Sequence, residues 1–93
     1  MERFLVVIEK ADNNYSAYLP DVPGCISTGN TIDETLKNIK EALEFHLEGL
    51  AEEGIQLFSP TSLEEHLTKG DIILDDDILI AYINVPVPKE LIT

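Results

Sequence analysis

The stretch YSAYLPDVPGCISTGNTIDETLKNIKEALEFHLEGL, residues 15–50, contains most of the information that decides the fold. It begins with an alternating segment that is typical of a strand with one buried face, which we expect at residues 14–20. Pro20 and Pro23 then fix φ and lack amide hydrogens, so strand pairing must lapse there, and Gly24 can adopt a positive φ without steric cost. We therefore predict a rigid, irregular loop that leads into a short strand at residues 25–29.

A long amphipathic helix is expected at residues 31–53. Thr31 is followed three residues later by Glu34, which is the signature of a capping box, and Gly54 supplies the stop. Apolar residues recur at helical spacing between these two signals. The apolar stripe consists of Ile32, Leu36, Ile39, Leu43, Leu47 and Leu50.

The flanking segments complete the expected architecture. RFLVVIEK predicts a strand at residues 3–10 that forms a hairpin through ADNN, and SPTSLEEHLTKG predicts a shorter helix at residues 62–69. ILIAYINV predicts a last strand at residues 77–86 with both faces covered, ended by Pro86 and Pro88. The order β-β-β-α-α-β indicates an α+β fold, in which a sheet of three to four strands carries the long helix on one face. We expect one domain, residues 1–93.

Composition limits the classes of partner. The chain has 93 residues, with 6 basic and 18 acidic ones, and its net charge of −12 repels phosphate backbones and attracts basic surfaces. Direct binding of nucleic acid is therefore not expected. The charge has two interpretations, solubility alone or a basic partner. A chain this short is marginally stable alone, so association would help it.

Cysteine usage and hydropathy predict the compartment. The single cysteine cannot form an internal disulfide, and the N-terminal apolar run is too short for a signal peptide. No stretch of about 20 apolar residues is present, so no transmembrane helix is expected. We expect a cytoplasmic protein that does not associate with membranes.

The region from Tyr15 to Leu50 resembles the signature of the HicB-type antitoxins: an aromatic strand, a proline, an aspartate, PGC, a short strand with a glycine, a capping-box helix and EAL followed by GL. The resemblance extends from about Phe4 to about Leu67. It implies a partial RNase H-like fold without catalytic activity. It also implies a partner, a small basic HicA-type toxin that resembles double-stranded-RNA-binding domains and cleaves mRNA with a histidine.

One feature of the family is not matched. Many HicB-type proteins continue after the last strand into a ribbon-helix-helix or helix-turn-helix module that binds DNA, whereas this sequence stops at VPVPKELIT. If the module is naturally missing, we expect operator binding to be absent or to belong to another protein; the alternative is that this sequence is a truncation of a longer chain. A stand-alone regulatory or structural module without a toxin partner is an alternative, and a degenerate enzyme or small-ligand domain is another.

No catalytic, metal or cofactor site is expected. The parent RNase H fold needs carboxylates that converge on metal ions, one of them within the first strand, but FLVVI contains none. Glu9 lies at the end of that strand and Asp12 in the turn. The run from Asp75 to Asp77 is interpreted as a solvated turn, because consecutive carboxylates point in different directions.

Three further side chains are assigned to packing. His46 and His66 are isolated from cysteine and from each other, which disfavours a zinc site. Cys25 has no histidine or asparagine linked to it in sequence, so we interpret it as a buried apolar residue rather than a nucleophile.

Two surfaces are candidates for protein contacts. Within the motif, the expected framework of the toxin-binding region is Tyr18, Asp21, Pro23, Gly24 and Cys25, with Asp21 as the polar contributor, although the same residues could simply build the corner. Phe45 falls about 140° or more from the centre of the apolar stripe and shares its face with Ala42 and Gly49. A lone exposed ring is the alternative, since single exposed aromatic residues are common. We expect this second face to mediate self-association into a homodimer or larger homo-oligomer.

Overall fold

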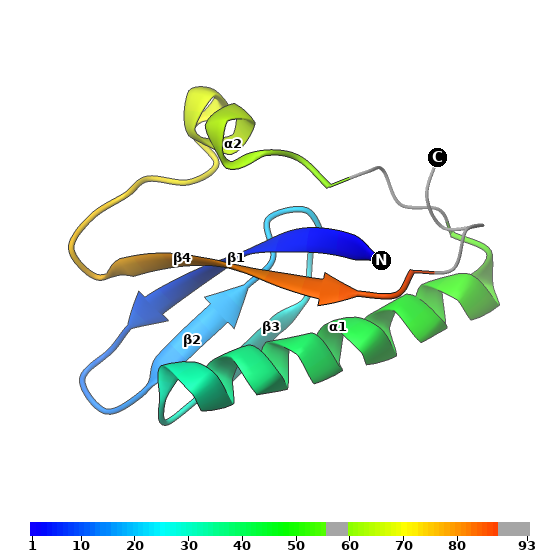
Figure 1. The fold of residues 1–93 in the computed structure, drawn as a ribbon, viewed down its shortest axis with the longest axis horizontal. Coiled ribbons are helices and arrows are strands. Elements are labelled where there is room, and N and C mark those ends of the chain that lie inside the picture. Colours follow the sequence, from blue (N-terminus) through cyan, green and yellow to red (C-terminus); the bar gives the residue numbers. More distant parts are fainter. Residues whose placement is uncertain (56–59, 88–93) are drawn as a thin grey trace.

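The computed structural model describes residues 1–55 and 60–87. Its elements are β1 (Glu2–Lys10), β2 (Tyr15–Tyr18), β3 (Ile26–Gly29), α1 (Ile32–Glu53), α2 (Leu63–Lys69) and β4 (Ile78–Val85). Four antiparallel strands form one sheet in the order β3-β2-β1-β4. The two helices lie on opposite faces of it (Figure 1). The α+β class and the order of elements are as predicted, with bounds that differ by one or two residues.

The central strand β1 carries the core on both of its faces. Its residues 4–8 are each at most 1% exposed. Phe4, Val6 and Ile8 pack toward α1, where Ile39, Leu43 and Leu47 of the predicted stripe are buried as well. On the other face, Leu5 and Val7 pack with Ile72 and the half-buried Leu63 of α2. Because side chains alternate along a strand, one short segment serves two apolar clusters.

The expectation that the last strand is covered on both faces is wrong for β4. This strand lies at the edge of the sheet, and Leu79 and Tyr82 are 41% and 44% exposed. The strand with two covered faces is β1, because it lies between β2 and β4 and under both helices. β4 ends at Val85, before Pro86 as expected, whereas Pro88 lies outside the described residues.

Helix α1 begins and ends at the predicted signals. The Thr31 hydroxyl accepts a hydrogen bond from the amide of Glu34 at 3.0 Å, and the Glu34 carboxylate accepts one from the amide of Asn30 at 3.2 Å. The carboxylate thus reaches one residue beyond the cap. Gly54 ends the helix in the left-handed region, with φ of 72°. Within residues 1–55 and 60–87, no helix is long and apolar enough to cross a membrane.

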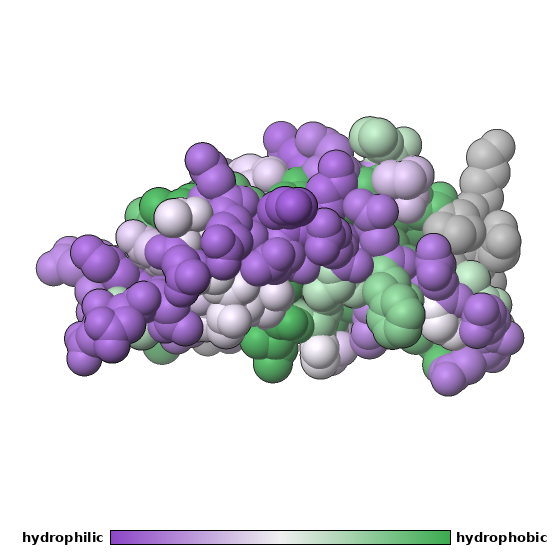
Figure 2. Space-filling view, turned by 90° about the horizontal axis from the view of Figure 1, so that it is seen from below, coloured by the Kyte–Doolittle hydropathy of each residue, from purple (hydrophilic) through white to green (hydrophobic). Residues whose placement is uncertain are grey.

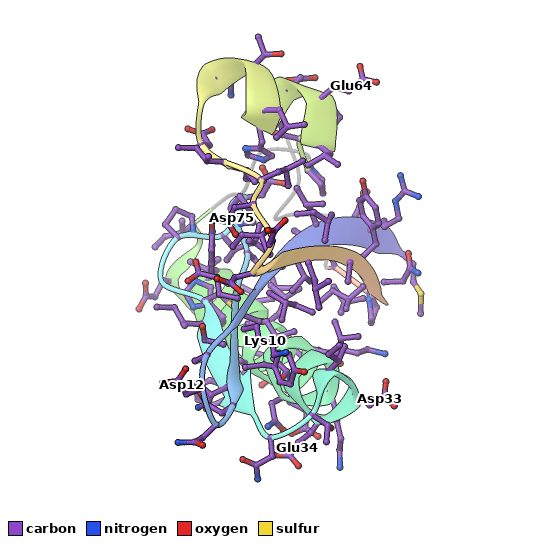
Figure 3. All side chains as sticks on the ribbon, turned by 90° about the vertical axis from the view of Figure 1, so that its left-hand side faces the viewer. Lys10, Asp12, Asp33, Glu34, Glu64 and Asp75 are labelled. Atoms are coloured by element: carbon purple, nitrogen blue, oxygen red, sulfur yellow. The ribbon has the colours of Figure 1, made fainter. Side chains whose placement is uncertain are left out.

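Acidic side chains are distributed over several elements rather than gathered at one point. Figure 3 shows Asp12 in the hairpin turn, Asp33 and Glu34 at the start of α1, Glu64 on α2 and Asp75 before β4. The face seen in Figure 2 is largely hydrophilic, with apolar residues visible between the hydrophilic ones. The acidic side chains are therefore spread over the hairpin turn, both helices and the segment before β4.

Candidate functional site

The loop between β2 and β3 folds back on itself. The amide of Leu19 donates to the carbonyl of Cys25 at 3.3 Å, and the amides of Val22 and Cys25 donate to the carbonyls of Leu19 and Val22, each at 3.1 Å. Val22 is 1% exposed and anchors the loop in the core on the α1 side of the sheet. Gly24 has φ of 86°, a conformation that glycine adopts without strain. The local sequence therefore builds the rigid corner that its prolines and glycine predict.

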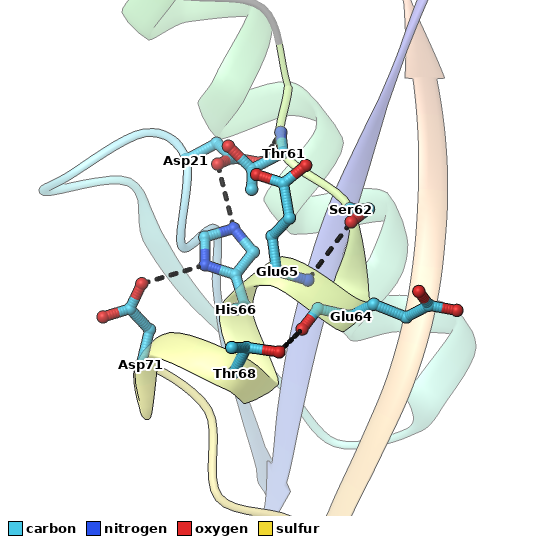
Figure 4. A network of polar contacts seen from close by, with 8 residues as sticks. All are labelled: Asp21, Thr61, Ser62, Glu64, Glu65, His66, Thr68 and Asp71. Carbon is cyan, nitrogen blue, oxygen red and sulfur yellow. Dashed lines mark hydrogen bonds and ion pairs between the residues drawn. The ribbon is translucent and has the colours of Figure 1, made fainter.

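A buried histidine ties this loop to α2. The Nε2 atom of His66 lies 2.9 Å from Oδ1 of Asp21, and its Nδ1 atom lies 3.1 Å from Oδ2 of Asp71 (Figure 4). The second oxygen of Asp21 accepts a hydrogen bond from the amide of Thr61 at 3.0 Å. We call Asp21, His66 and Asp71 the histidine bridge. It connects segments that are 45 residues apart in the sequence.

The ends of α2 position the histidine bridge. The Ser62 hydroxyl caps the first turn by accepting from the amide of Glu65 at 3.2 Å. Gly70 ends the helix with φ of 81°, which turns the chain back so that the amide of Asp71 donates to the carbonyl of His66 at 3.0 Å. The Asp71 carboxylate is thereby held beside the His66 ring. The capping motif predicted from sequence thus places one of the two carboxylates.

The three members of the histidine bridge differ in exposure. The side chains of His66 and Asp21 are 4% and 10% exposed, whereas that of Asp71 is 51% exposed. Each ring nitrogen lies within hydrogen-bonding distance of one carboxylate, and the tautomer determines which nitrogen donates. Both ring nitrogens face protein oxygens, so neither is free to act as a general base. The packing role predicted for His66 agrees with this geometry.

A shallow groove runs beside the loop. It has a volume of about 370 Å³ and is lined by Tyr18, Leu19, Pro20, Pro23, Gly24, Cys25, Ile26 and Asp71. Ile26 is 65% exposed, so an apolar side chain lies open at the groove. Burial and the nearby charges of Glu9 and Asp71 raise the pKa of Tyr18. The groove therefore combines apolar surface with negative charge, which suits a partner that presents both apolar and basic groups.

The five predicted contact residues divide into two groups. Tyr18 is half-buried in the groove wall, and Pro23 and Gly24 are exposed. Asp21 and Cys25 point inward: the Asp21 carboxylate is engaged by His66 and Thr61, and Cys25 is 4% exposed. Burial raises the pKa of the Cys25 thiol to about 11, so the thiol is protonated near neutral pH. This agrees with its predicted role as a packed apolar residue.

The predicted self-association face lies on the outer side of α1. Phe45 is 79% exposed, and Gly49 is half-buried beside it. Ala42 instead packs against the core on the α1 side of the sheet, so the structure separates it from the exposed ring. A shallow depression of about 200 Å³ next to Phe45 is lined by Phe45, His46, Gly49, Leu50 and Glu53.

Comparison with known proteins identifies the family. Residues 4–92 match the family described as HicB-like antitoxin of bacterial toxin-antitoxin systems. The chain belongs to the HicB-like antitoxin family. This result confirms the resemblance that the motif from Tyr15 to Leu50 indicated.

Solved HicB structures share the fold. The N-terminal domain of the Burkholderia pseudomallei antitoxin HicB is 30% identical with a TM-score of 0.73, and the alignment covers 91% of this chain and 99% of that domain. A chain of the HicA3 and HicB3 toxin-antitoxin complex is 25% identical with a TM-score of 0.70, over 90% of this chain and 98% of that one. The HicB-like assignment therefore holds at the level of both sequence and fold.

Two curated relatives differ in how much of their own length matches this chain. An uncharacterized 14.9 kDa protein of Haemophilus phage HP1 is 34% identical over 80 residues, which are 86% of this chain but 58% of the phage protein. A UPF0150 protein of Helicobacter pylori is 43% identical over 53 residues, which are 57% of this chain and 74% of that protein. The chain thus spans little more than half the length of the phage relative.

The histidine bridge is the part of this HicB-like site that the sequence did not predict. Asp21 was singled out because of the loop motif, and His66 was assigned to packing, but nothing in the sequence links the two. Their contact depends on how α2 lies on the sheet, which the apolar cluster of Leu5, Val7 and Leu63 determines. The capping signals at Ser62 and Gly70 located the helix, but not its partner.

Proposed function

We propose that this HicB-like chain is the antitoxin of a type II toxin-antitoxin system, and that it binds and masks a HicA-type ribonuclease toxin that cleaves mRNA. The observation that carries the proposal is the rigid loop whose groove presents apolar and acidic groups on a chain of net charge −12. The neighbour solved within a HicA3 and HicB3 complex supports the choice of partner. A basic toxin is attracted by the charge, which accelerates association, while the apolar contacts set the lifetime of the complex.

The proposed binding surface is the groove beside the loop. Tyr18, Pro23 and Gly24 supply its contact surface, together with the exposed Ile26. Asp21 and Cys25 hold the loop in place from within, so Asp21 acts through the histidine bridge. A preordered loop loses little conformational entropy on binding, which favours a tight complex.

The proposal assigns no catalytic step, metal or cofactor to this chain. The antitoxin acts by covering the RNA-binding surface or the catalytic histidine of the toxin. It does not contact nucleic acid itself, because its negative charge opposes that of a phosphate backbone.

Co-expression with a HicA-type toxin, sought among the short basic proteins encoded beside this chain, tests the proposal. Growth should be rescued by the wild-type chain, and the purified pair should form a complex. Ile26→Arg places a cation in the groove and should weaken toxin binding by about tenfold or more, with little effect on folding because the side chain is 65% exposed.

Phe45→Arg is the matched control, because it introduces the same side chain at a position that is 79% exposed on the outer side of α1. It should leave toxin binding unchanged. Equal loss with both variants would reject the groove as the binding surface, and absence of any complex with the wild-type chain would reject the toxin partner.

A further inference from the structure

The two edges of the sheet differ in how they are protected. β3 forms one edge and has 4 residues, whereas β4 forms the other and has 8. The outer row of backbone groups on an edge strand is a template for pairing with another strand. Which groups form that row follows from the hydrogen-bond pattern of each ladder.

The pattern on β4 can be worked out from one bond at its beginning. The amide of Lys10 donates to the carbonyl of Asp77 at 2.9 Å, and the register between β1 and β4 continues from this pair. In an antiparallel ladder, hydrogen-bonded pairs of residues alternate with pairs that are not hydrogen-bonded. The backbone N–H and C=O groups therefore point toward β1 at Leu79, Ala81 and Ile83. The even-numbered residues therefore direct theirs outward. These are Ile78, Ile80, Tyr82 and Asn84.

The edge at β3 is blunted. The same alternation, starting from the bond between the amide of Leu19 and the carbonyl of Cys25, turns the backbone groups of Thr28 outward. The Nδ2 atom of Asn38 on α1 donates to the Thr28 carbonyl at 2.8 Å. A side chain from the neighbouring helix thus occupies the edge.

The edge at β4 has no such protection within residues 1–55 and 60–87. The amide of Ile78 donates to the carbonyl of Asp75 at 3.3 Å, but the outward groups of Ile80, Tyr82 and Asn84 have no partner in the described part of the chain. The strand ILIAYINV contains no charged residue and no proline, the residues that natural proteins place on exposed edges to prevent pairing.

We propose that β4 pairs antiparallel with β4 of a second copy of this chain. A two-fold axis at Ala81 places Ile80 opposite Tyr82 of the second copy and Asn84 opposite Ile78, so the ladder takes up the outward groups of Ile80 and Tyr82 and the outward amide of Asn84. Directly opposed aromatic and β-branched side chains stabilise such a pair. The result is one continuous sheet across the dimer, with both α1 helices on the same face.

Charge at the two ends of β4 favours a second copy in this orientation. The acidic run from Asp75 to Asp77 precedes the strand, whereas Arg3 lies beside Asn84 at the other end and stacks over Tyr82 at 4.4 Å. An antiparallel arrangement brings the acidic end of one copy to the Arg3 end of the other. This local complementarity offsets part of the repulsion between two chains of net charge −12.

The arrangement of α1 leaves space for this pairing. The helix packs chiefly against β3 and β2, at the opposite side of the sheet from β4. The groove of the proposed toxin site involves β2, β3 and the loop between them, so dimerisation through β4 does not cover it. The dimer is therefore independent of the proposed function, and each can fail without the other.

Amide hydrogen exchange of the isolated chain tests the pairing directly, with sedimentation at the same concentrations. At high concentration the mass should be twice 10.4 kDa, and the amides of Ile80, Tyr82 and Asn84 should exchange at least about tenfold more slowly than in the dilute monomer. The amides of Leu79 and Ala81, which bond to β1, should be protected at both concentrations. A monomer at all concentrations overturns the proposal, and so does a dimer in which the outward amides stay unprotected.

Substitutions distinguish this edge from the outer side of α1. Tyr82→Pro removes an outward donor without removing a bond to β1, and Tyr82→Lys keeps the donor but adds an edge charge. Both should convert the dimer to a monomer while the chain stays folded by circular dichroism. Phe45→Glu is the control and should leave the dimer intact. If Phe45→Glu abolishes the dimer and Tyr82→Lys does not, the interface lies on the outer side of α1 and the proposal is wrong. If the outward amides become protected only after toxin is added, the β4 edge binds the toxin and not a second copy.

Discussion

Replacing His66 with alanine should destabilise the fold by about 3 to 4 kcal/mol. The substitution leaves the Asp21 carboxylate, 10% exposed, with the Thr61 amide as its remaining hydrogen-bond partner among the described residues. Leaving a buried acceptor without its donor costs about 1 to 3 kcal/mol, and more when the acceptor is a carboxylate, whereas a half-exposed carboxylate such as Asp71 recovers its hydration and contributes at most about 1 kcal/mol. The loss is a large fraction of the roughly 5 to 14 kcal/mol that a chain of this length has available.

Urea unfolding at neutral pH, followed by circular dichroism, measures this loss through two double-mutant cycles. One cycle combines His66→Ala with Asp21→Ala, and the other combines His66→Ala with Asp71→Ala. The first coupling energy should be about 2 kcal/mol or more, and the second should be below about 1 kcal/mol, because solvent screens the exposed carboxylate. Because the coupling energy subtracts the loss caused by each single substitution, the Thr61 hydrogen bond that Asp21→Ala also removes does not contribute to it.

The two carboxylates control for each other, since they contact the same ring at 2.9 Å and 3.1 Å and differ mainly in exposure. Equal coupling energies, or a larger one for Asp71, would refute the argument that burial decides the strength of each contact. A His66→Ala variant as stable as the wild type would refute the bridge itself.

Three further measurements test other parts of the structure. Gly29→Ala should destabilise the fold by about 1 to 3 kcal/mol in thermal unfolding, because a Cβ there would lie 2.6 Å from the amide nitrogen of Thr35. Cys25→Ala should flatten the fall in stability between pH 9 and pH 11, since burial raises the pKa of the folded thiol from 9.0 to about 11 and the unfolded thiol ionises first. Asn38→Ala should cost about 1 kcal/mol in thermal unfolding, because it removes the hydrogen bond that the side-chain amide donates to the Thr28 carbonyl.

Local signals in the sequence located almost every element. The capping boxes at Thr31 and Ser62 and the glycines at Gly54 and Gly70 depend on hydrogen bonds between near neighbours, so they can be recognised without the tertiary structure. The loop at Pro20 and Pro23 was predicted for the same reason. The family motif extended this to the partner class, which the comparisons support at the level of the HicB-like family.

The assignment of β4 shows where a local pattern is insufficient. Its apolar run suggested a strand that is covered on both faces. The strand instead lies at the edge of the sheet, where its side chains pack against the apolar clusters on the two faces but are only partly covered by them. Strand order is a property of long-range pairing. Hydrophobicity along a single strand does not report it.

Local patterns and composition were enough to specify the helices, the hairpin, the corner at the motif PDVPGC and the sign of the charge, since each depends on residues a few positions apart or on composition alone. Tertiary structure alone decided that His66 meets Asp21 across 45 positions and that β4 lies at an open edge. Both outcomes depend on how α2 and the strands pack on β1. Such packing is set by the summed apolar contacts of the whole core, which no local pattern specifies.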